Sequence, residues 1–329
     1  MAEAVIGTLF LLEGTGFDPY ENLAREELLL RRTGEGCCTL YLWQNRNTVV
    51  IGRNQNPWKE CRCALLEQEG GRLARRLSGG GAVFHDRGNL NFTFLLPEED
   101  FDKERQTEVL LRACRALDIP AERSGRNDLL AGGRKFSGHA FYHHEGRAYH
   151  HGTILLDADL EKLGRYLAPS PAKLRAKGVD SVRARVGNLR ELAPTLTIPA
   201  LKKALTAALG EVYGLPVEPL EPETLAGAAL TALTARYRSW DWNFGQRLPF
   251  DFACEGRFDW GEARLELRVE SGLIQSARVY TDAMDWTLSP KAEAALTGCR
   301  LEMPALQARL LAALPETGEE LSRLLAENL

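Results

Sequence analysis

Residues 75–94 read RRLSGGGAVFHDRGNLNFTF, the most informative stretch of this 329-residue chain. It ends in a strand-like alternation, with Phe92 and Phe94 on one face and Asn91 and Thr93 on the other. Before it, three consecutive glycines let the backbone approach an anion, while two arginines supply neutralising charge. No GK[ST] sequence follows, so the run is not a Walker P-loop. By itself the pattern is equally typical of a phosphate cradle and of a plain glycine turn.

Two further motifs lie downstream of the glycine run. SGRNDLL (124–130) places an Asn-Asp pair before a short strand, and their oxygens are a partial ligand set for Mg²⁺. The same pair is also ordinary turn chemistry. GGRKFSGHA (132–140) carries Lys135, one of nine lysines in a chain with 32 arginines. An ammonium held in a groove is a fixed charge for a carboxylate and a phosphate together. An isolated lysine on an edge strand is more commonly solvated.

All six histidines lie between residues 85 and 151, a clustering that suggests a metal. However, HHEG (143–146) is expected at a hairpin tip, and His150 and His151 alternate across an expected strand. Without a carboxylate or cysteine at ligand spacing, we expect no structural zinc. The seven cysteines, Cys61 and Cys63 included, follow neither disulfide nor zinc-knuckle spacing. We expect all of them to be reduced structural thiols.

Local patterns predict an α+β fold with two domains. DPYE (18–21) has the acidic N-cap, proline and capping-box Glu of a helix that runs to about Arg32. We expect strands over residues 4–12, 39–44, 48–52, 90–96, 127–131, 134–142 and 147–156, the second and third forming a hairpin around residues 45–47. We expect further helices over residues 101–117, 157–166, 199–213 and 222–237. From about residue 247 a three-strand meander (250–258, 263–270, 273–280) precedes helices near 291–296, 304–314 and 317–327.

This organisation predicts a main domain over residues 1–246, a mixed sheet with flanking helices, and a small α+β C-terminal domain over residues 247–329. The segment YRSWDWNFGQ (237–246) is the expected junction, with Trp240, Trp242 and Phe244 anchoring a hinge. We expect the small domain to be a mobile cap on the main one.

Composition excludes several classes of protein. Hydrophobic residues make up 44% and charged residues 26%, which is globular composition. The longest uncharged stretch covers only residues 224–235, so we expect no membrane partner, and no secretory signal opens the chain, so we expect a cytoplasmic protein. Residues 1–246 carry 32 basic and 31 acidic side chains, and residues 247–329 carry nine and 14. Neither part has the basic excess that phosphate backbones attract, so we expect no nucleic acid.

In their residues and in their order along the chain, these motifs resemble those of the lipoate–protein ligases of the biotin/lipoate protein ligase superfamily. The matching runs are GRNQNPWKEC (52–61), RRLSGGGAVFHDRGNLNFTF (75–94), SGRNDLLAGGRKFSGHAFY (124–142), HHGTILLDADLEKL (150–163), AKGVDSVRARVGNL (176–189) and SWDWNFGQ (239–246). The resemblance covers nearly the whole chain. Residues 247–329 make it similar to the long type, which has a C-terminal accessory domain.

The resemblance implies an AMP-forming ligase. Such enzymes join (R)-lipoate to ATP, release pyrophosphate, and pass the lipoyl group to a lysine of a lipoyl domain, on an E2 subunit of a 2-oxoacid dehydrogenase complex or on the glycine cleavage H protein. Lys135 then corresponds to the catalytic lysine between the carboxylate and the α-phosphate. Asp128, with Asn127, matches the phosphate and Mg²⁺ position. We expect octanoate as a weaker substrate and a monomeric protein.

The residues that the resemblance implies for ATP and lipoyl-adenylate binding lie in these motifs. They are Arg76, Ser78, Gly79, Gly80, Gly81, Ala82, Val83, Phe84, His85, Asn127, Asp128, Lys135, Ser137, Gly138, Ala140, His151, Gly152, Thr153 and Arg183. Residues 175–188 correspond to a loop that covers the adenylate and excludes water. His139 departs from the motif, where Asn or Ser is usual, and we expect it to alter the pocket wall.

Two alternatives stay open. One is a transferase that takes octanoyl or lipoyl from a carrier or a preformed adenylate. Its cysteine-dependent form needs a nucleophilic thiol in the pocket, and the cysteines avoid the three motif segments. The other is a non-catalytic adenylate- or lipoyl-binding module, against which Lys135 and Asp128 argue. A biotin ligase is disfavoured because no GRGRxGR-type loop is present.

Overall fold

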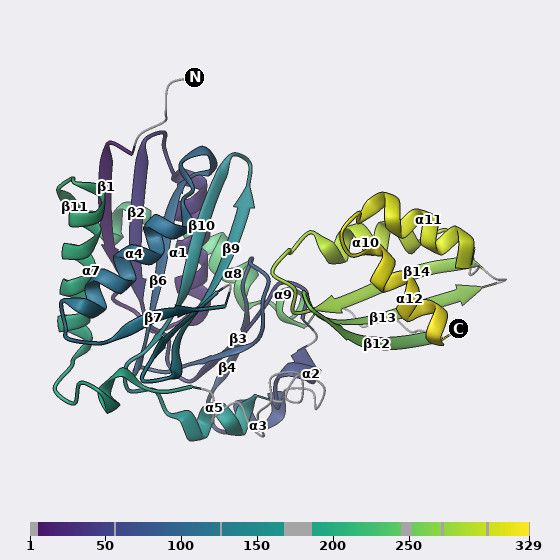
Figure 1. Cartoon of the computed structure of the whole chain (residues 1–329), viewed down its shortest axis with the longest axis horizontal. Coiled ribbons are helices and arrows are strands. Elements are labelled where there is room, and N and C mark those ends of the chain that lie inside the picture. The colour runs from purple at the N-terminus through teal and green to yellow at the C-terminus, as the bar shows by residue number, and fades with distance from the viewer. Residues whose placement is uncertain are drawn as a thin grey trace.

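The computed structural model describes residues 6–55, 57–125, 127–167, 186–244, 252–270, 273–300 and 303–328. Its centre is an eight-stranded sheet in the order β11-β1-β2-β6-β10-β9-β8-β7 (Figure 1). The strands are β1 (Thr8–Glu13), β2 (Cys37–Trp43), β6 (Asn89–Pro97), β7 (Ala121–Ser124), β8 (Asp128–Ala131), β9 (Arg134–His144), β10 (Arg147–Leu155) and β11 (Val217–Pro219). Strand β1 runs parallel to β2 and β11, and the other neighbours are antiparallel, so the sheet is mixed as predicted.

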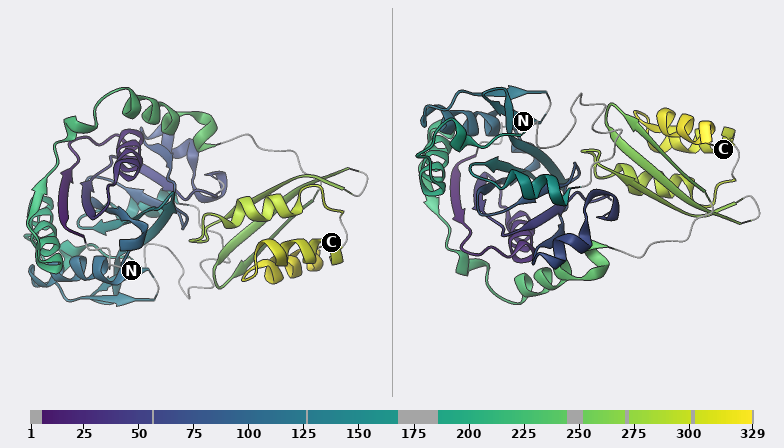
Figure 2. Two further views of the ribbon diagram at one scale, coloured as in Figure 1. Left: turned by 90° about the horizontal axis from the view of Figure 1, so that it is seen from above. Right: turned by 90° about the horizontal axis from the view of Figure 1, so that it is seen from below.

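Helices cover both faces of this sheet (Figures 1 and 2). On one face lie α1 (Pro19–Arg32) and α8 (Ala228–Arg238), and on the other α4 (Lys103–Arg115) and α7 (Ile198–Tyr213). Successive side chains of β6 point to opposite faces of the sheet, and they show what each pair of helices packs against. Phe92 and Phe94 are fully buried in the core under α4 and α7, each worth about 1.5–3 kcal/mol of burial. Thr93 points to the α1 face, where its hydroxyl donates to Glu26.

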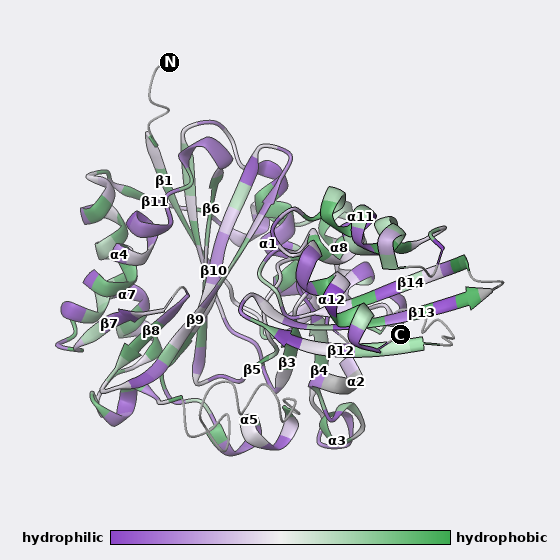
Figure 3. Cartoon of the chain, turned by 45° about the vertical axis from the view of Figure 1, so that its right-hand side comes forward, coloured by the Kyte–Doolittle hydropathy of each residue, from purple (hydrophilic) through white to green (hydrophobic). Residues whose placement is uncertain are grey.

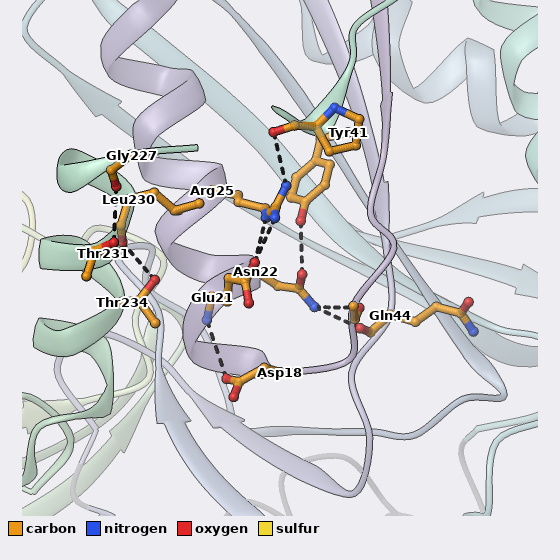
Figure 4. Close-up of polar contacts among 12 residues, drawn as sticks. Asp18, Glu21, Asn22, Arg25, Tyr41, Gln44, Gly227, Leu230, Thr231 and Thr234 are labelled. Atoms are coloured by element: carbon orange, nitrogen blue, oxygen red, sulfur yellow. Dashed lines mark hydrogen bonds and ion pairs between the residues drawn. The ribbon is translucent and has the colours of Figure 1, made fainter. Parts of the chain in front are cut away.

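The predicted hairpin over residues 39–52 is wrong. Strand β3 (Thr48–Ile51) belongs to a separate three-stranded sheet with β4 (Arg72–Arg75) and β5 (Val83–His85). The connection is held against the start of α1, because the Asn22 side-chain amide donates to the Gln44 carbonyl oxygen at 2.8 Å, and Asn22 accepts from the Tyr41 hydroxyl (Figure 4). Asn47, at a φ of 45°, then turns the chain away from β2.

Helix α1 begins as predicted, with Asp18 as N-cap accepting from the amide of Tyr20 at 2.9 Å. The single helix predicted over residues 222–237 is wrong: Gly227, at a φ of 129°, separates the 3₁₀ turn η4 (Pro222–Leu225) from α8. The remaining short elements are α2 (Pro57–Glu60), α3 (Cys63–Gln68), η1 (Glu98–Asp100), α5 (Leu160–Tyr166), η3 (Leu189–Glu191) and α9 (Trp240–Asn243). Among the described helices, none combines the length and apolarity needed to cross a bilayer.

The small C-terminal domain has the predicted meander, β12 (Phe252–Phe258), β13 (Gly261–Glu270) and β14 (Leu273–Thr281). Helices α10 (Leu288–Leu296), α11 (Met303–Ala313) and α12 (Gly318–Asn328) lie on one face of it (Figures 2 and 3). Its core is its own, with Leu265, Ile274 and Leu321 fully buried. The expected boundary between residues 246 and 247 falls within 245–251, outside the described residues.

Candidate active site

A cavity of about 350 Å³ opens on the α1 face of the main sheet. Its floor is one row of cross-strand partners over five adjacent strands: Trp43 on β2, Asn91 on β6, Thr153 on β10, Gly138 on β9 and Asp128 on β8. Directly paired residues project from the same face, so strand register alone collects these five. At roughly 4.8 Å per strand the row is about 19 Å long, which suits an elongated ligand.

Lys135 and Asp128 stand together at one end of this floor. The Lys135 Nζ lies 2.7 Å from Asp128 Oδ1, and both side chains are about one third exposed. A β-bulge between Leu129 and Leu130 shifts the register of β8 on β9 at this point. The ammonium has three protons, so it can pair with Asp128 and still donate to anions bound in the cavity.

The glycine run forms another wall of the cavity. The Arg76 side chain holds the conformation of this run through hydrogen bonds to its backbone. The buried guanidinium donates to the carbonyl oxygens of Val50, Gly79 and Gly81 and to Ser78 Oγ. Burial lowers the pKa of Arg76 to about 10, which still leaves it charged at neutral pH. Position 80 favours glycine because the φ of Gly80 is 89°, which other residues rarely adopt. The loop is thus curled around a fixed positive charge that also borders the cavity.

Arg75, the other arginine of the motif, does not face an anion site. Among the described residues, its guanidinium donates to backbone carbonyl oxygens, those of Gly52, Arg53, Gln55, Trp242 and Asn243. It therefore ties α9 to the start of the glycine run. The expectation that both arginines neutralise a bound anion is wrong for Arg75.

A buried chain of polar groups supports the far part of the floor. His151 Nδ1 lies 2.8 Å from Glu26 Oε1, and His151 Nε2 lies 2.8 Å from Ser78 Oγ. Glu26 comes from α1 and is 1% exposed. Sequence reasoning missed it, although an acidic residue on the apolar face of a predicted helix was the available signal. Ser78 is fully buried and positions His151 without bordering the cavity.

Four of the histidines are buried, and in three of them burial favours the neutral form. It lowers the pKa of His85 and of His139 to about 3, and lowers that of His150 well below its usual value. His139 borders the cavity, but its ring packs against Phe92 and His150 in the core. Across the described part of the chain, no three His, Cys, Asp or Glu side chains gather as metal ligands.

The small domain supplies the roof, and sequence reasoning named none of its lining residues because no motif lies there. Six of its residues border the cavity: Arg257, Asp259, Trp260, Gly261, Asp282 and Met284. The amide of Gly80 donates to the Ala283 carbonyl oxygen at 3.0 Å, and the Asn54 amide group donates to the Trp286 carbonyl oxygen at 2.8 Å. The glycine run therefore lies between the two domains.

The aromatic junction contacts the main domain through Trp242. The guanidinium groups of Arg53 and Arg236 lie over the Trp242 ring, at 4.2 Å and 4.5 Å from its centroid. Its indole N–H donates to the Arg75 carbonyl oxygen. Trp240 is 54% exposed and stacks on Phe244.

Most of the expected site residues meet at the cavity. Its lining includes Arg76, residues 80–85, Asn127, Asp128, Lys135, Ser137, Gly138, Ala140, His151, Gly152 and Thr153. Ser78 and Gly79 lie behind the wall. Arg183 and most of the expected covering loop fall within 168–185, outside the described residues.

Comparison with known proteins agrees with this architecture. Residues 18–210 match the family model of the lipoyl protein ligase A/B catalytic domain, and residues 248–320 match that of the bacterial lipoate protein ligase C-terminus. The chain belongs to the lipoyl protein ligase A/B family, and its fold is that of lipoate–protein ligases.

Three solved structures illustrate the similarity. LipL1 of P. falciparum, in complex with lipoate, is 25% identical with a TM-score of 0.85, covering 97% of this chain and 99% of its own. A lipoate-protein ligase A bound with ATP is 25% identical with a TM-score of 0.62, covering 73% and 98%. A bi-partite lipoate protein ligase of T. acidophilum, described with its E2 lipoyl domain, is 26% identical with a TM-score of 0.63, covering 75% and 100%.

Proposed function

We propose that this chain is an ATP-dependent lipoate–protein ligase. It activates (R)-lipoate to lipoyl-adenylate and then transfers the lipoyl group to a lysine of a lipoyl domain, on an E2 subunit of a 2-oxoacid dehydrogenase complex or on the glycine cleavage H protein. The observation that carries the proposal is the Lys135 ammonium, held by Asp128 at one end of an elongated cavity whose wall is the glycine run.

In the first half-reaction the acyl carboxylate attacks the α-phosphate of ATP, and two anions must approach each other. The Lys135 ammonium offsets this charge, while the glycine run and Arg76 line the space for the phosphates. In the second half-reaction the acceptor lysine attacks the acyl carbonyl carbon and AMP leaves. Pyrophosphate leaves in the first step and AMP in the second, and Lys135 remains beside the α-phosphate in both, so one residue serves both.

The acyl chain would extend along the floor away from Lys135. The lining there includes Leu23, Trp43, Val50 and Leu155, which suit an aliphatic C8 chain. The roof supplied by the small domain reduces contact with water, which would otherwise hydrolyse the mixed anhydride.

Asp128 and Asn127 fit a Mg²⁺ bound mainly through phosphate. Mg²⁺ prefers oxygen ligands and is usually held by one or two carboxylates together with substrate phosphates. Asp128 and Asn127 border the cavity, and their carboxylate and side-chain amide oxygens would supply such ligands. Bound there, the ion would neutralise charge on the phosphates. We expect activity to require Mg²⁺ or Mn²⁺ and to survive a zinc-selective chelator.

A cysteine-dependent transferase is disfavoured. The structure describes all seven cysteines, and none of them borders the cavity. A transferase that uses only preformed lipoyl-adenylate shares the same cavity, and so does a non-catalytic binding module.

One assay separates these functions. Purified protein is mixed with (R)-lipoate, ATP, Mg²⁺ and a lipoyl domain, with each component omitted in turn, and pyrophosphate and the acceptor mass are measured. A ligase releases pyrophosphate only with lipoate present and adds one lipoyl group to the acceptor. Transfer from added lipoyl-adenylate without pyrophosphate release would instead identify a transferase, and binding with neither reaction a binding module.

A further inference from the structure

Cys61 and Cys63 are folded toward each other at the junction of α2 and α3. Arg62 between them has φ −77° and ψ 72°, the geometry of an inverse γ-turn, which brings the flanking residues together. The Cys63 thiol donates to the Cys61 carbonyl oxygen at 3.4 Å and to the Pro57 carbonyl oxygen at 3.6 Å, and the two thiols are close enough to shift each other's pKa. Backbone and side chains thus already approach the arrangement that a disulfide requires.

The two thiols differ in reactivity. Cys61 is 2% exposed, whereas Cys63 is only partly buried. The neighbouring Cys61 thiol lowers the pKa of Cys63, and the Cys63 thiol together with burial raises the pKa of Cys61. A more acidic, accessible thiol beside a buried partner is the usual arrangement of a reactive cysteine and its resolving cysteine.

The pair is connected to the wall of the cavity. Cys61 forms a β-bridge with Leu167, and the amide of Arg62 donates to the Tyr166 carbonyl oxygen at 2.9 Å. The Cys61 side chain belongs to the same buried cluster as Leu167 and Val186. Both of these residues border the cavity, and they flank the segment 168–185.

We propose that Cys61 and Cys63 are a redox modification site, which forms a reversible intramolecular disulfide by exchange with a low-molecular-weight disulfide and thereby lowers the activity of the adjacent cavity. The effect on activity rests on the proposed ligase function. Formation of the disulfide does not.

The exchange is balanced in two steps. The Cys63 thiolate attacks one sulfur of the disulfide RS–SR, so that a Cys63–SR mixed disulfide forms and RS⁻ leaves. The Cys61 thiol then loses its proton, its thiolate attacks the Cys63 sulfur, and the second RS⁻ leaves. The two departing thiolates take up the protons that the cysteines gave, so the protein loses two electrons and RS–SR becomes two RSH.

The consequence follows from packing. Cys61 is buried in the same close-packed cluster as Leu167 and Val186, and Cys63 packs against that cluster. A disulfide draws the two sulfur atoms together, so the packing of this cluster must adjust and the cavity wall shifts. Since displacements of about 1 Å can cost about 100-fold in rate, we expect oxidation to reduce lipoate activation at least about tenfold.

The test incubates the full-length reduced protein with glutathione disulfide, alone and in mixtures with glutathione. Peptide mapping should find a Cys61–Cys63 disulfide, with the intact mass lowered by two hydrogens, and lipoate-dependent pyrophosphate release should fall and recover with dithiothreitol. The variants Cys63→Ser and Cys63→Ala should keep full activity under oxidation. Cys37→Ser, which alters a partly buried thiol away from the cavity, should remain as sensitive as the wild type.

Failure to detect the Cys61–Cys63 disulfide at any glutathione disulfide ratio overturns the proposal. So does a disulfide that leaves activity unchanged, or equal inhibition of the Cys63 variants. Reduced wild-type protein without lipoate-dependent pyrophosphate release would instead reject the ligase function and the regulatory half of the inference, while the peptide map still decides whether the disulfide forms.

Discussion

Lys135 occupies the space that a side chain on Gly138 would need. A Cβ built on Gly138 would lie 2.7 Å from Lys135 Nζ and 2.8 Å from its Cε, and 3.8 Å from Asp128 Oδ1. The lysine thus folds back over β9, and the glycine three residues later is what lets its ammonium reach Asp128.

Gly138→Ala should therefore displace the ammonium without removing it. We expect lipoate-dependent pyrophosphate release to fall at least about 100-fold, because small misplacements of a reacting group are costly. The matched control is Gly164→Ala in α5, where nothing lies within 4 Å of the added methyl group. It should leave activity unchanged and the helix slightly more stable. Near wild-type activity of Gly138→Ala would show that the position of Lys135 does not matter.

Lys135→Ala should abolish both half-reactions and leave the fold intact, since the side chain is partly exposed and its described ion pair is with Asp128. Losing this charge should cost roughly 3–4 kcal/mol of transition-state stabilisation. Lys135→Arg keeps the positive charge but not the shape of the side chain, so it should recover little of the activity lost in Lys135→Ala. Pyrophosphate release and transfer from added lipoyl-adenylate are measured separately. An adenylation rate near that of the wild type would remove Lys135 from the mechanism.

Octanoate should compete with lipoate. Both present a carboxylate on a C8 chain, and a largely apolar cavity distinguishes a dithiolane from methylenes by only about 1–3 kcal/mol. Inhibition of lipoyl transfer by octanoate, with octanoylated acceptor detected by mass, is the measurement. If octanoate neither inhibits lipoyl transfer nor modifies the acceptor at concentrations at which lipoate saturates the enzyme, the cavity does not bind the acyl chain in this way.

A chain ending at Gln246 should lose activation but keep transfer. It lacks the six residues that form the roof and the Ala283 carbonyl oxygen that accepts from Gly80. We expect it to transfer lipoyl from added lipoyl-adenylate and to form adenylate poorly. If the shortened protein is soluble and activates lipoate as fast as the full chain, the small domain only stabilises the fold.

Stability should fall in acid because of the buried histidines. The folded-state pKa values of His85 and His139 are about 3, below the ordinary 6.5, so below pH 6.5 the unfolded chain binds protons that the folded chain does not. As the pH falls from about 6.5 to 3, each histidine should lower the free energy of unfolding by about 1.4 kcal/mol per pH unit, with no effect above pH 6.5.

His139→Asn should reduce this slope in urea unfolding, whereas His144→Asn, at an exposed hairpin position, should not. Identical pH profiles for the wild type and His139→Asn would contradict the assignment.

Local chemistry made several features of this protein predictable. Asp18, Pro19 and Glu21 mark the start of α1, and the alternation of Phe92 and Phe94 with Asn91 and Thr93 marks β6. Both signals lie within a few residues of chain, where backbone preferences and side-chain periodicity act. The glycine run and the Lys135 motif likewise identified one wall and one end of the cavity. Sequence thus determined the α+β class, the type of the long elements and about half of the lining residues.

The tertiary structure alone decided which segments pair and which residues complete the site. Nothing near residues 45–47 reveals that Asn22, over 20 positions earlier, holds the turn and sends β3 into another sheet. Glu26 and the Ala283 carbonyl group reach the site from α1 and from the small domain, and Arg75 donates to backbone carbonyl groups instead of an anion. These roles depend on contacts between residues far apart in the chain, whose formation depends on packing of the whole core and leaves no local sequence pattern.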